Sequence, residues 1–244
     1  MLCLYRIRNT FCKEAPKNEG RIVMKEYYVD LHVHVGRSSK GEEVKKATAA
    51  NLTFENIAFE SYHRKGIDVI GVVDCASPYI IEDIEELLDR GEIKEKEVGG
   101  RRVKANYGLN PKLGKYHRSF CTVCDSIISG EPPVLKCPVS EKHDLVVGVR
   151  DRIEVIKDRN MPEASKRAQY HYQVPLEFLP KVGPKTIDKL INHFGNEMNI
   201  LHQATRSELK KVVKDEIAEN IILAREGRIG IDAGGGGIYG RVEA

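Results

Sequence analysis

Three cysteines and a histidine follow one another at the spacing of a metal-binding module, and this feature constrains the fold of the chain most. Two residues separate Cys121 from Cys124, twelve residues separate Cys124 from Cys137, and five residues separate Cys137 from His143. A Cys-x-x-Cys turn directs both thiolates at one ion, and a loop of this length can bring the second pair back to it. The spacing predicts a structural zinc site, with His117 as an alternative fourth ligand.

The cysteines also bear on the compartment. Six cysteines could indicate a secreted disulfide framework, but the first residues carry charges within their only apolar stretch and so lack the apolar core of a signal peptide. We therefore expect a cytoplasmic protein whose clustered thiols bind metal. A thioredoxin-type redox pair is the alternative, although its strand–helix context is missing. No apolar run approaches the roughly 18 residues of a membrane-spanning helix, so we expect no integral membrane protein.

The first part of the chain alternates between strand and helix patterns. In order, the pattern predicts a strand over 27–35, a helix over 51–65, a strand over 67–73 and a helix over 80–89. Such an order begins an α/β layer or barrel. Residues 1–23 show neither periodicity, and we expect a disordered leader or sequence upstream of a misassigned start.

Possible metal ligands lie at the ends of both predicted strands. Alternation places Asp30, His32 and His34 on one face of the first strand. Asp74 and Cys75 end the second strand, and parallel strands share the edge at which they end. Imidazole and carboxylate together suit zinc, manganese or iron. Ordinary core or surface histidines are the alternative interpretation.

These segments, YYVDLHVHVGRSSKG and KGIDVIGVVDCASP, resemble the PHP domain, a metal-dependent phosphoesterase barrel, and more specifically the endonuclease Q family. The resemblance implies cleavage of DNA 5′ of deaminated bases such as uracil and hypoxanthine. It also implies a divalent ion, Zn²⁺, Mn²⁺ or Mg²⁺, at the PHP site. His32 and His34 match the first metal motif of the family, Asp74 matches the second, and Cys75 stands where many PHP proteins have histidine. The implied catalytic residues are Asp30, His32, His34, Asp74 and Cys75.

The later metal motifs of the family are missing. Residues 91–102 are charged and glycine-punctuated, no third strand–helix unit follows, and His117 is the only histidine between residues 91 and 121. A two-metal site shares many ligands between ions about 3.5–4 Å apart, and this chain supplies too few. We therefore expect a partial PHP-type barrel with impaired hydrolysis. The alternative is a non-catalytic, zinc-dependent DNA-binding protein with a vestigial PHP region.

A third motif lies in residues 179–186 (LPKVGPKT), which resemble the helix-hairpin-helix consensus. Gly183 removes a Cβ at the turn, and Pro184 suits the first position of a helix. Backbone amides at that helix start, with two lysines, would bind a DNA phosphate without base specificity. A plain helical turn would use similar residues. The predicted DNA-binding residues are Lys181, Gly183, Lys185 and Thr186.

Charge is distributed unevenly along the chain. Residues 25–100 have 10 basic and 16 acidic side chains, whereas residues 101–160 have 12 and 7. An acidic metal-binding part followed by a basic, nucleic-acid-contacting part fits this split, as does ordinary scatter of surface charge. The segment around the cysteines resembles the zinc ribbon of endonuclease Q. Its cations, which could meet phosphates or be solvated, are Arg118, Lys136, Lys142, Arg150 and Arg152.

The last seventy residues are predicted to be helical, followed by a glycine-rich tail (AGGGGIYG) between two short strand-like segments. The tail could let nucleic acid approach the backbone or be a flexible turn. The predicted helices are 175–180, 184–194, 197–203, 206–213 and 215–226, the fourth with a Thr205–Glu208 capping box. The predicted domains are a leader (1–23), a partial PHP domain (24–100), a zinc module (108–160) and a helix-hairpin-helix domain (161–244). Expected partners are damaged or deaminated DNA and a further repair or replication protein.

Overall fold

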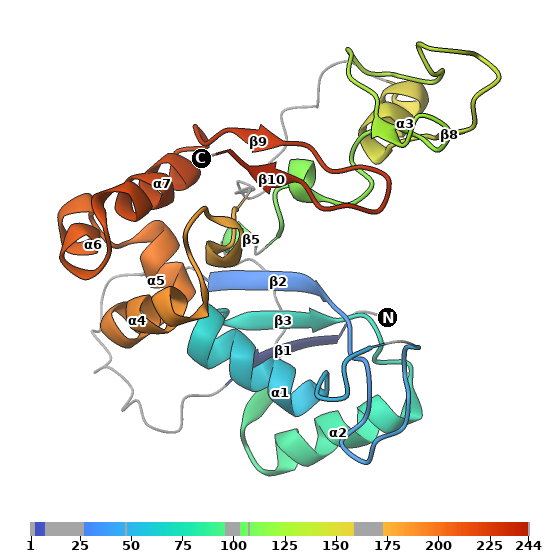
Figure 1. Cartoon of the computed structure of the whole chain (residues 1–244). Helices are drawn as coiled ribbons and strands as arrows, with labels where there is room; N and C mark the ends of the chain where they lie inside the picture. Colours follow the sequence, from blue (N-terminus) through green and yellow to red (C-terminus); the bar gives the residue numbers. More distant parts are fainter. Residues whose placement is uncertain are drawn as a thin grey trace. The chain divides into compact units, whose positions relative to one another are not determined.

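The computed structural model describes residues 3–7, 27–46, 48–95, 103–106, 108–158 and 173–243 (Figure 1). The chain divides into two compact units, each described here by itself. The N-terminal unit comprises Met1–Gly108, Ala168–His171 and Asp188–Ala204. The C-terminal unit comprises Leu109–Arg167, Tyr172–Ile187 and Thr205–Ala244.

A five-stranded mixed sheet forms the base of the N-terminal unit, with strand order β4-β1-β3-β2-β5. Its centre is the parallel pair predicted from the sequence, β2 (Tyr27–Val33) and β3 (Val69–Val72). β5 (Val103–Asn106) runs parallel to β2 at one edge. On the other side, β1 (Cys3–Ile7) pairs antiparallel with β3 and with β4 (Ile93–Glu95). The described strands therefore form an open sheet.

Two helical segments follow β2 and β3. α1 (Phe54–Phe59) starts at Thr53, whose side chain accepts a hydrogen bond from the helix, and continues as a π-helical turn, η1 (Glu60–Lys65). α2 (Pro78–Asp89) follows β3. The core of this unit is made of buried apolar side chains from the helices and from β3. They are Phe54 and Ala58 of α1, Ile80, Ile84 and Leu87 of α2, and Ile70 and Val72 of β3.

Two strands of this sheet are not predicted by the sequence pattern. Residues 3–7 form β1, although the sequence predicts a disordered leader over residues 1–23. Residues 93–95 form β4 within the charged segment 91–102. β1 pairs with the open edge of β3, and β4 then pairs with the free edge of β1, because an open strand edge readily accepts a neighbour. Residues 8–23 of the predicted leader lie outside the described residues.

A small three-stranded antiparallel sheet, with order β7-β6-β8, begins the C-terminal unit. Its strands are β6 (Phe120–Cys121), β7 (Ser126–Ile127) and β8 (Leu145–Val146), and a short 3-10 turn, η2 (Pro111–Leu113), precedes them. α3 (Val149–Ile156) follows β8. The sequence pattern does not predict α3, because its one buried residue is a polar aspartate rather than part of an apolar stripe.

The predicted helices of the last seventy residues are confirmed to within a few residues. They are η3 (Leu176–Phe178), which is a 3-10 turn, α4 (Pro184–Phe194), α5 (Glu197–His202), α6 (Arg206–Val212) and α7 (Asp215–Arg225). Thr205 and Glu208 form the expected capping box. The tail forms a two-stranded hairpin of β9 (Ile231–Asp232) and β10 (Arg241–Val242). Across the described ranges, no helix has the length and apolar character that a bilayer crossing requires.

Candidate metal centre and nucleic-acid interface

The predicted zinc ligands converge on one point in the C-terminal unit. Nδ1 of His143 lies 3.7 Å from the sulfur of Cys121, 3.3 Å from that of Cys124 and 3.5 Å from that of Cys137. The sulfurs of Cys124 and Cys137 are 3.7 Å apart. Typical Zn–S and Zn–N bonds in a tetrahedron give edges of about 3.8 Å between sulfurs and about 3.5 Å between sulfur and nitrogen. The cluster therefore has the size of a tetrahedral site for an ion such as zinc.

The environment of the thiols favours metal binding. Burial opposes ionisation of Cys137, but hydrogen bonds from the backbone of Ser140 and Val139, with contributions from Cys121 and His143, lower the pKa of Cys137 to about 6. A hydrogen bond with Cys121, burial of the thiol and a hydrogen bond with Cys137 together raise the pKa of Cys124 to about 12. Thiolates packed this closely repel one another, and a divalent cation removes that repulsion.

His117, the alternative fourth ligand, does not join the cluster. Within the described part of the chain, the one group of at least three Cys, His, Asp or Glu side chains near enough to share an ion consists of Cys121, Cys124, Cys137 and His143. Burial lowers the pKa of His117, and the positive charges of Arg118, Arg150 and Lys112 lower it further. Cations therefore gather around this histidine.

A buried aspartate ties α3 to the metal module. Asp151 is fully buried and accepts hydrogen bonds from the amide and hydroxyl of Ser119, at 3.0 and 2.9 Å, and from the amide of Val134, at 2.8 Å. Burial alone would raise its pKa, but these hydrogen bonds and Arg118 lower it. No motif in the sequence indicates this residue. Its one local signal is an aspartate in the first turn of a short helix.

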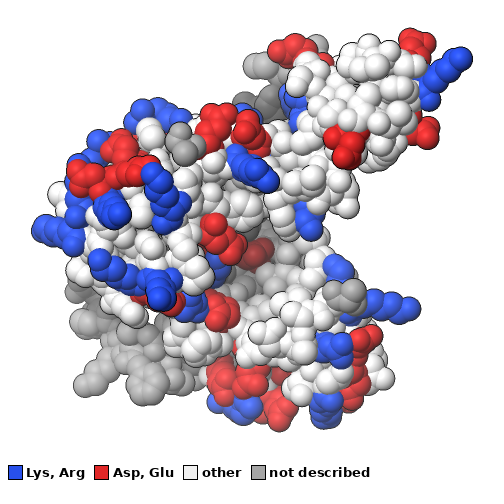
Figure 2. All heavy atoms as spheres, viewed as in Figure 1, with Lys and Arg blue, Asp and Glu red and all other residues white. Residues whose placement is uncertain are grey.

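Only some cations of this module are available to a phosphate. The guanidinium of Arg118 donates to the carbonyl of Gly130 at 2.7 Å and lies near Asp151, so its role is structural. Lys136 pairs with Glu141, and Arg150 pairs with Glu154. Lys142 and Arg152 are exposed and have no ion-pair partner among the described residues. The face of the module seen in Figure 2 is mostly uncharged, with charges at its margins.

The PHP-like residues lie near the ends of β2 and β3, as the parallel pairing predicts. Nδ1 of His34 is 3.0 Å from Oδ2 of Asp74, which also accepts from the amide of Val35 at 2.9 Å. Because the carboxylate accepts, Nδ1 donates and Nε2 of His34 is left for another partner. The rings of His32 and His34 are 4.9 Å apart and nearly perpendicular. A carboxylate that orients an imidazole in this way is common beside metal ligands.

The remaining PHP-like residues do not complete a cluster. The pairing of β2 with β3 is irregular between Asp30 and Val33, so strict alternation fails there. Asp30 accepts from the amide of His32 at 3.1 Å, and burial raises the pKa of Asp30. Cys75 is buried. The assignment of these residues to a metal site stays a prediction.

The predicted DNA-binding hairpin forms a tight turn before α4. Pro184 is the first residue of this helix, and a Cβ on Gly183 would meet nothing within 4 Å, so the turn has an open side. Lys181 adopts a left-handed conformation, with φ of 64°, and pairs with Glu216 of α7. Lys185 is exposed and has no ion-pair partner in the described ranges. The amide of Thr186 donates to the carbonyl of Gly183 at 2.9 Å and is therefore occupied.

The glycine-rich tail packs against protein rather than lying open. Gly234 exchanges backbone hydrogen bonds with Lys112 and Arg118, both at 2.8–2.9 Å. A Cβ on Gly234 would come within 2.4 Å of the carbonyl oxygen of Gly114. The first glycines thus permit a close approach of two backbones, which differs from both interpretations given by the sequence.

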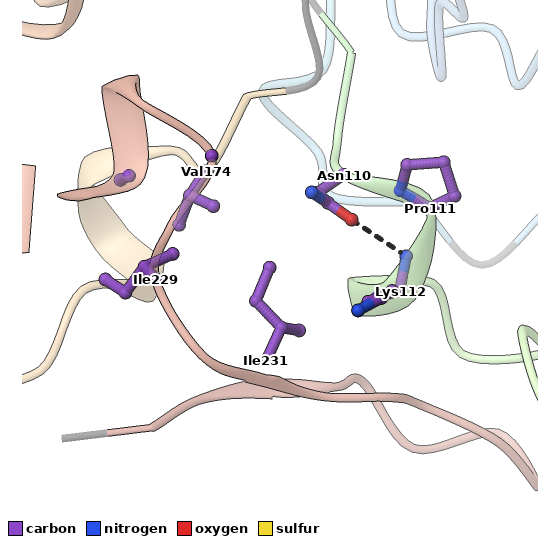
Figure 3. A pocket seen from close by; sticks show the side chains of 8 residues that line it. Asn110, Pro111, Lys112, Val174, Ile229 and Ile231 are labelled. Atoms are coloured by element: carbon purple, nitrogen blue, oxygen red, sulfur yellow. Dashed lines mark hydrogen bonds between the residues drawn. The ribbon is translucent and has the colours of Figure 1, made fainter.

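A cavity of about 360 Å³ lies beside the tail hairpin (Figure 3). Val174, Ile229 and Ile231 point toward it, and the side chain of Asn110 turns back to accept from the amide of Lys112 at 3.0 Å. Asn110 and Lys112 are the polar side chains of a lining that is otherwise apolar. The residues around it are Asn110, Pro111, Lys112, Val174, Ala224, Gly227, Ile229 and Ile231.

Two curated proteins share sequence with the chain. It is 42% identical over 144 residues to the uncharacterized protein YqxK of Bacillus subtilis, an alignment of 59% of this chain and 36% of the relative. It is 31% identical over 175 residues to the uncharacterized protein MJ0043 of Methanocaldococcus jannaschii, covering 66% of this chain and 22% of the relative. The chain therefore spans about a third or less of these relatives. No family model matches it.

Two solved structures are similar to the chain, each with a TM-score of 0.48 and 26% identity. One is the lesion-specific endonuclease PfuEndoQ of Pyrococcus furiosus, matched over 66% of this chain and 41% of that protein. The other is endonuclease Q in complex with a 27-mer duplex substrate that has an abasic lesion at the active site, matched over 68% and 43%. Both solved structures are of endonuclease Q, the family that the sequence motifs also resemble.

Proposed function

We propose that the chain is an endonuclease Q-like DNA-repair protein whose C-terminal unit binds the DNA backbone, with zinc in the Cys₃His site. The observation that carries the proposal is the open turn at Gly183, which precedes α4 and is flanked by an exposed lysine. The predicted domains assign DNA contacts to residues 108–160 and 161–244, and PHP chemistry to residues 24–100.

The hairpin offers a phosphate both amides and charge. Pro184 has no N–H, and the amide of Thr186 is already bonded, so the amides of Gly183 and Lys185 are the available donors. The Nζ of Lys185 adds a cation, and the start of an eleven-residue helix adds a partial positive charge. Lys181 must leave Glu216 to contribute in the same way. Contacts of this type hold DNA without reading its sequence.

The Cys₃His residues stabilise this binding unit. Two of the three thiols are buried and pack with Ile128, so loss of the ion would leave their charges uncompensated within a small core. The site has four protein ligands and no open position, which suits a structural rather than a catalytic ion.

Hydrolysis is the activity that the family resemblance implies at the PHP-like residues. His32, His34 and Asp74 would hold the divalent ion, which when bound would activate water for attack on a phosphodiester. Their present arrangement does not fit a complete two-metal site, because Asp74 is engaged by His34 and by the amide of Val35. We therefore expect cleavage 5′ of uracil or hypoxanthine to be slow. The same observation favours the alternative, a DNA-binding protein without nuclease activity.

Binding and cleavage are tested together. Purified chain is titrated into labelled duplexes that contain uracil, hypoxanthine or only normal bases, at several salt concentrations, and each duplex is then incubated with Mn²⁺, Mg²⁺ or Zn²⁺. We expect salt-sensitive binding to all duplexes and slow cutting 5′ of the deaminated base. Binding without any cutting would favour the non-catalytic alternative. Absence of DNA binding at low salt would refute the proposal.

A further inference from the structure

Three large side chains beside the tail hairpin are exposed without an evident structural reason. Tyr116 is 57% exposed, Ile238 60% and Tyr239 49%, and we call these three residues the aromatic patch. The two segments that carry these side chains lie next to each other. The amide of Gly237 donates to the carbonyl of Lys115 at 3.1 Å, and a Cβ on Gly237 would lie 3.9 Å from the hydroxyl of Tyr116. Clustered exposed apolar side chains mark binding surfaces more often than scattered ones do.

The glycine run holds the patch in a defined position. Gly236 and Gly237 both have positive φ, 61° and 89°, and a Cβ on Gly236 would lie 2.4 Å from the ring of Phe120. Gly240 at the other end of the loop donates to the carbonyl of Leu113 at 3.0 Å. Because both ends of the loop are fixed to the metal module, Ile238 and Tyr239 are presented outward with little freedom to lose on binding.

The surroundings of the patch are cationic. Nζ of Lys115 lies 4.6 Å from the centre of the Tyr239 ring. Neither Lys115 nor Lys112 has an ion-pair partner among the residues that the structure describes. Burial and then the charges of Arg118, Arg150 and Lys112 lower the pKa of the neighbouring His117, which indicates a positive local potential. Aromatic rings interleaved with lysines are the composition of a surface for unpaired nucleic acid.

The patch also adjoins the predicted phosphate-binding hairpin. The ring of Tyr239 packs at 81° against that of Phe178, with centres 5.9 Å apart. Phe178 is the last residue of η3 and precedes Gly183 by five residues. The backbones of Phe178 and Gly183 can therefore be at most about 18 Å apart, the length of a fully extended chain of five residues. At about 3.4 Å per base pair, this distance corresponds to roughly five base pairs. A DNA backbone at the hairpin would pass within reach of the patch.

We propose that the aromatic patch binds an unstacked nucleotide of the DNA held by the hairpin. The base stacks on the ring of Tyr239, and the side chains of Ile238 and Tyr116 lie beside it. Because Lys115 lies over the Tyr239 ring and Phe178 packs against it, the base stacks on the part of the ring that these two residues leave exposed. Bases inside an intact duplex already stack on their neighbours, so the patch selects DNA with an unpaired or displaced base. This inference rests on the proposed DNA binding and extends it from the backbone to the bases.

The test compares a duplex that contains a short run of unpaired thymidines with a fully paired duplex of equal length. Tyr239→Ala should weaken binding to the unpaired duplex by about tenfold, the typical effect of losing one base–aromatic stack, and leave the paired duplex unchanged. Ile238→Ala should show the same selectivity, and Tyr239→Phe should retain most affinity. Zinc content and circular dichroism verify that each variant is folded.

A direct reading of stacking comes from fluorescence, because the chain contains no tryptophan. Tyr239→Trp should be quenched by the unpaired duplex and much less by the paired one. Tyr79→Trp, at a similarly exposed tyrosine (46%) on α2, serves as the control and should respond equally to both. Equal losses on both duplexes for Tyr239→Ala, or no selective quenching, would overturn the inference while leaving hairpin binding intact. Failure of the unmodified chain to bind either duplex would overturn the proposed function as well.

Discussion

Nδ1 of His143 lies 3.3 Å from the sulfur of Cys124, although the two residues are separated by a long loop. This contact completes a four-ligand cluster whose dimensions match a tetrahedral metal site. It also distinguishes His143 from His117, the two candidates that the sequence leaves open.

The first prediction concerns the fourth ligand. His143→Ala should weaken zinc binding strongly, because a direct bond to the ion is lost. The loss should exceed the 10- to 100-fold effect that is typical when the mutated residue only hydrogen-bonds to a metal ligand. His117→Ala is the matched control and should retain the metal. Zinc content after dialysis against a graded series of chelator concentrations measures both. Equal retention by the two variants would contradict the assignment.

The second prediction concerns Asp151. Asp151→Asn should reduce the free energy of unfolding by about 3 kcal/mol, because one amide oxygen cannot accept from both Ser119 and Val134 as the carboxylate does. Urea unfolding of the zinc-loaded protein measures the loss. Asp144→Asn, at an exposed aspartate of the same module, should change stability by less than about 0.5 kcal/mol.

The pH dependence of this effect follows from the lowered pKa of Asp151. A carboxyl group with a depressed native pKa stabilises the fold fully above its unfolded value, here 3.8, and loses that contribution as the pH falls through the native pKa. The difference between the unmodified chain and Asp151→Asn should thus be constant from pH 5 to pH 8 and shrink below about pH 4. A difference that grows in acid would be inconsistent with this role.

The third prediction concerns Gly183 and Gly234, whose backbone φ lies outside the left-handed region, so that only the space around an added Cβ differs between them. Gly234→Ala should destabilise the chain by about 1–3 kcal/mol, because its Cβ would collide with backbone atoms of Gly114 and Gly240. Gly183→Ala should leave the melting temperature nearly unchanged, since its Cβ would enter open space. The same Gly183→Ala variant should weaken DNA binding, because the methyl group obstructs a phosphate. Thermal melts and DNA titrations separate the two effects.

The fourth prediction concerns the hairpin lysines. Lys181→Ala with Lys185→Ala should weaken binding equally for all DNA sequences and reduce the slope of log K against log salt by up to about two, one per phosphate contact. Lys45→Ala with Lys46→Ala removes the same charge from exposed positions of the N-terminal unit and should leave the slope unchanged. If both pairs have the same effect, only net charge matters and the hairpin makes no phosphate contact.

The fifth prediction concerns catalysis. Cleavage of deoxyinosine-containing DNA should be far slower than by a full-length endonuclease Q, because His34 and Asp74 bond to each other and the described residues supply no complete ligand set around them. Restoring a full barrel should recover the rate more than any single substitution. Rapid cutting by this chain that His32→Ala abolishes would prove the prediction wrong, and His63 and Glu60 would then be the first residues to test as missing ligands.

Local sequence signals account for most of the helices and for the paired strands. Thr205 and Glu208 cap a helix through neighbouring backbone groups, and Pro184 fixes the φ value with which α4 begins. These effects act over a few residues and therefore need no knowledge of the fold. The strands β1 and β4 have no such local signal, since β1 depends on the open edge of β3 and β4 depends on the edge of β1.

The sequence by itself determined the metal ligand types and their spacing, because a Cys-x-x-Cys turn and its return loop are local geometry. Only the tertiary structure decided between His143 and His117, since that choice depends on where a loop returns. It also decided that Asp151 is a buried anchor and that Gly234 packs against Gly114. Each of these contacts joins residues far apart in the chain, and a linear pattern contains no information on which distant groups will bury one another.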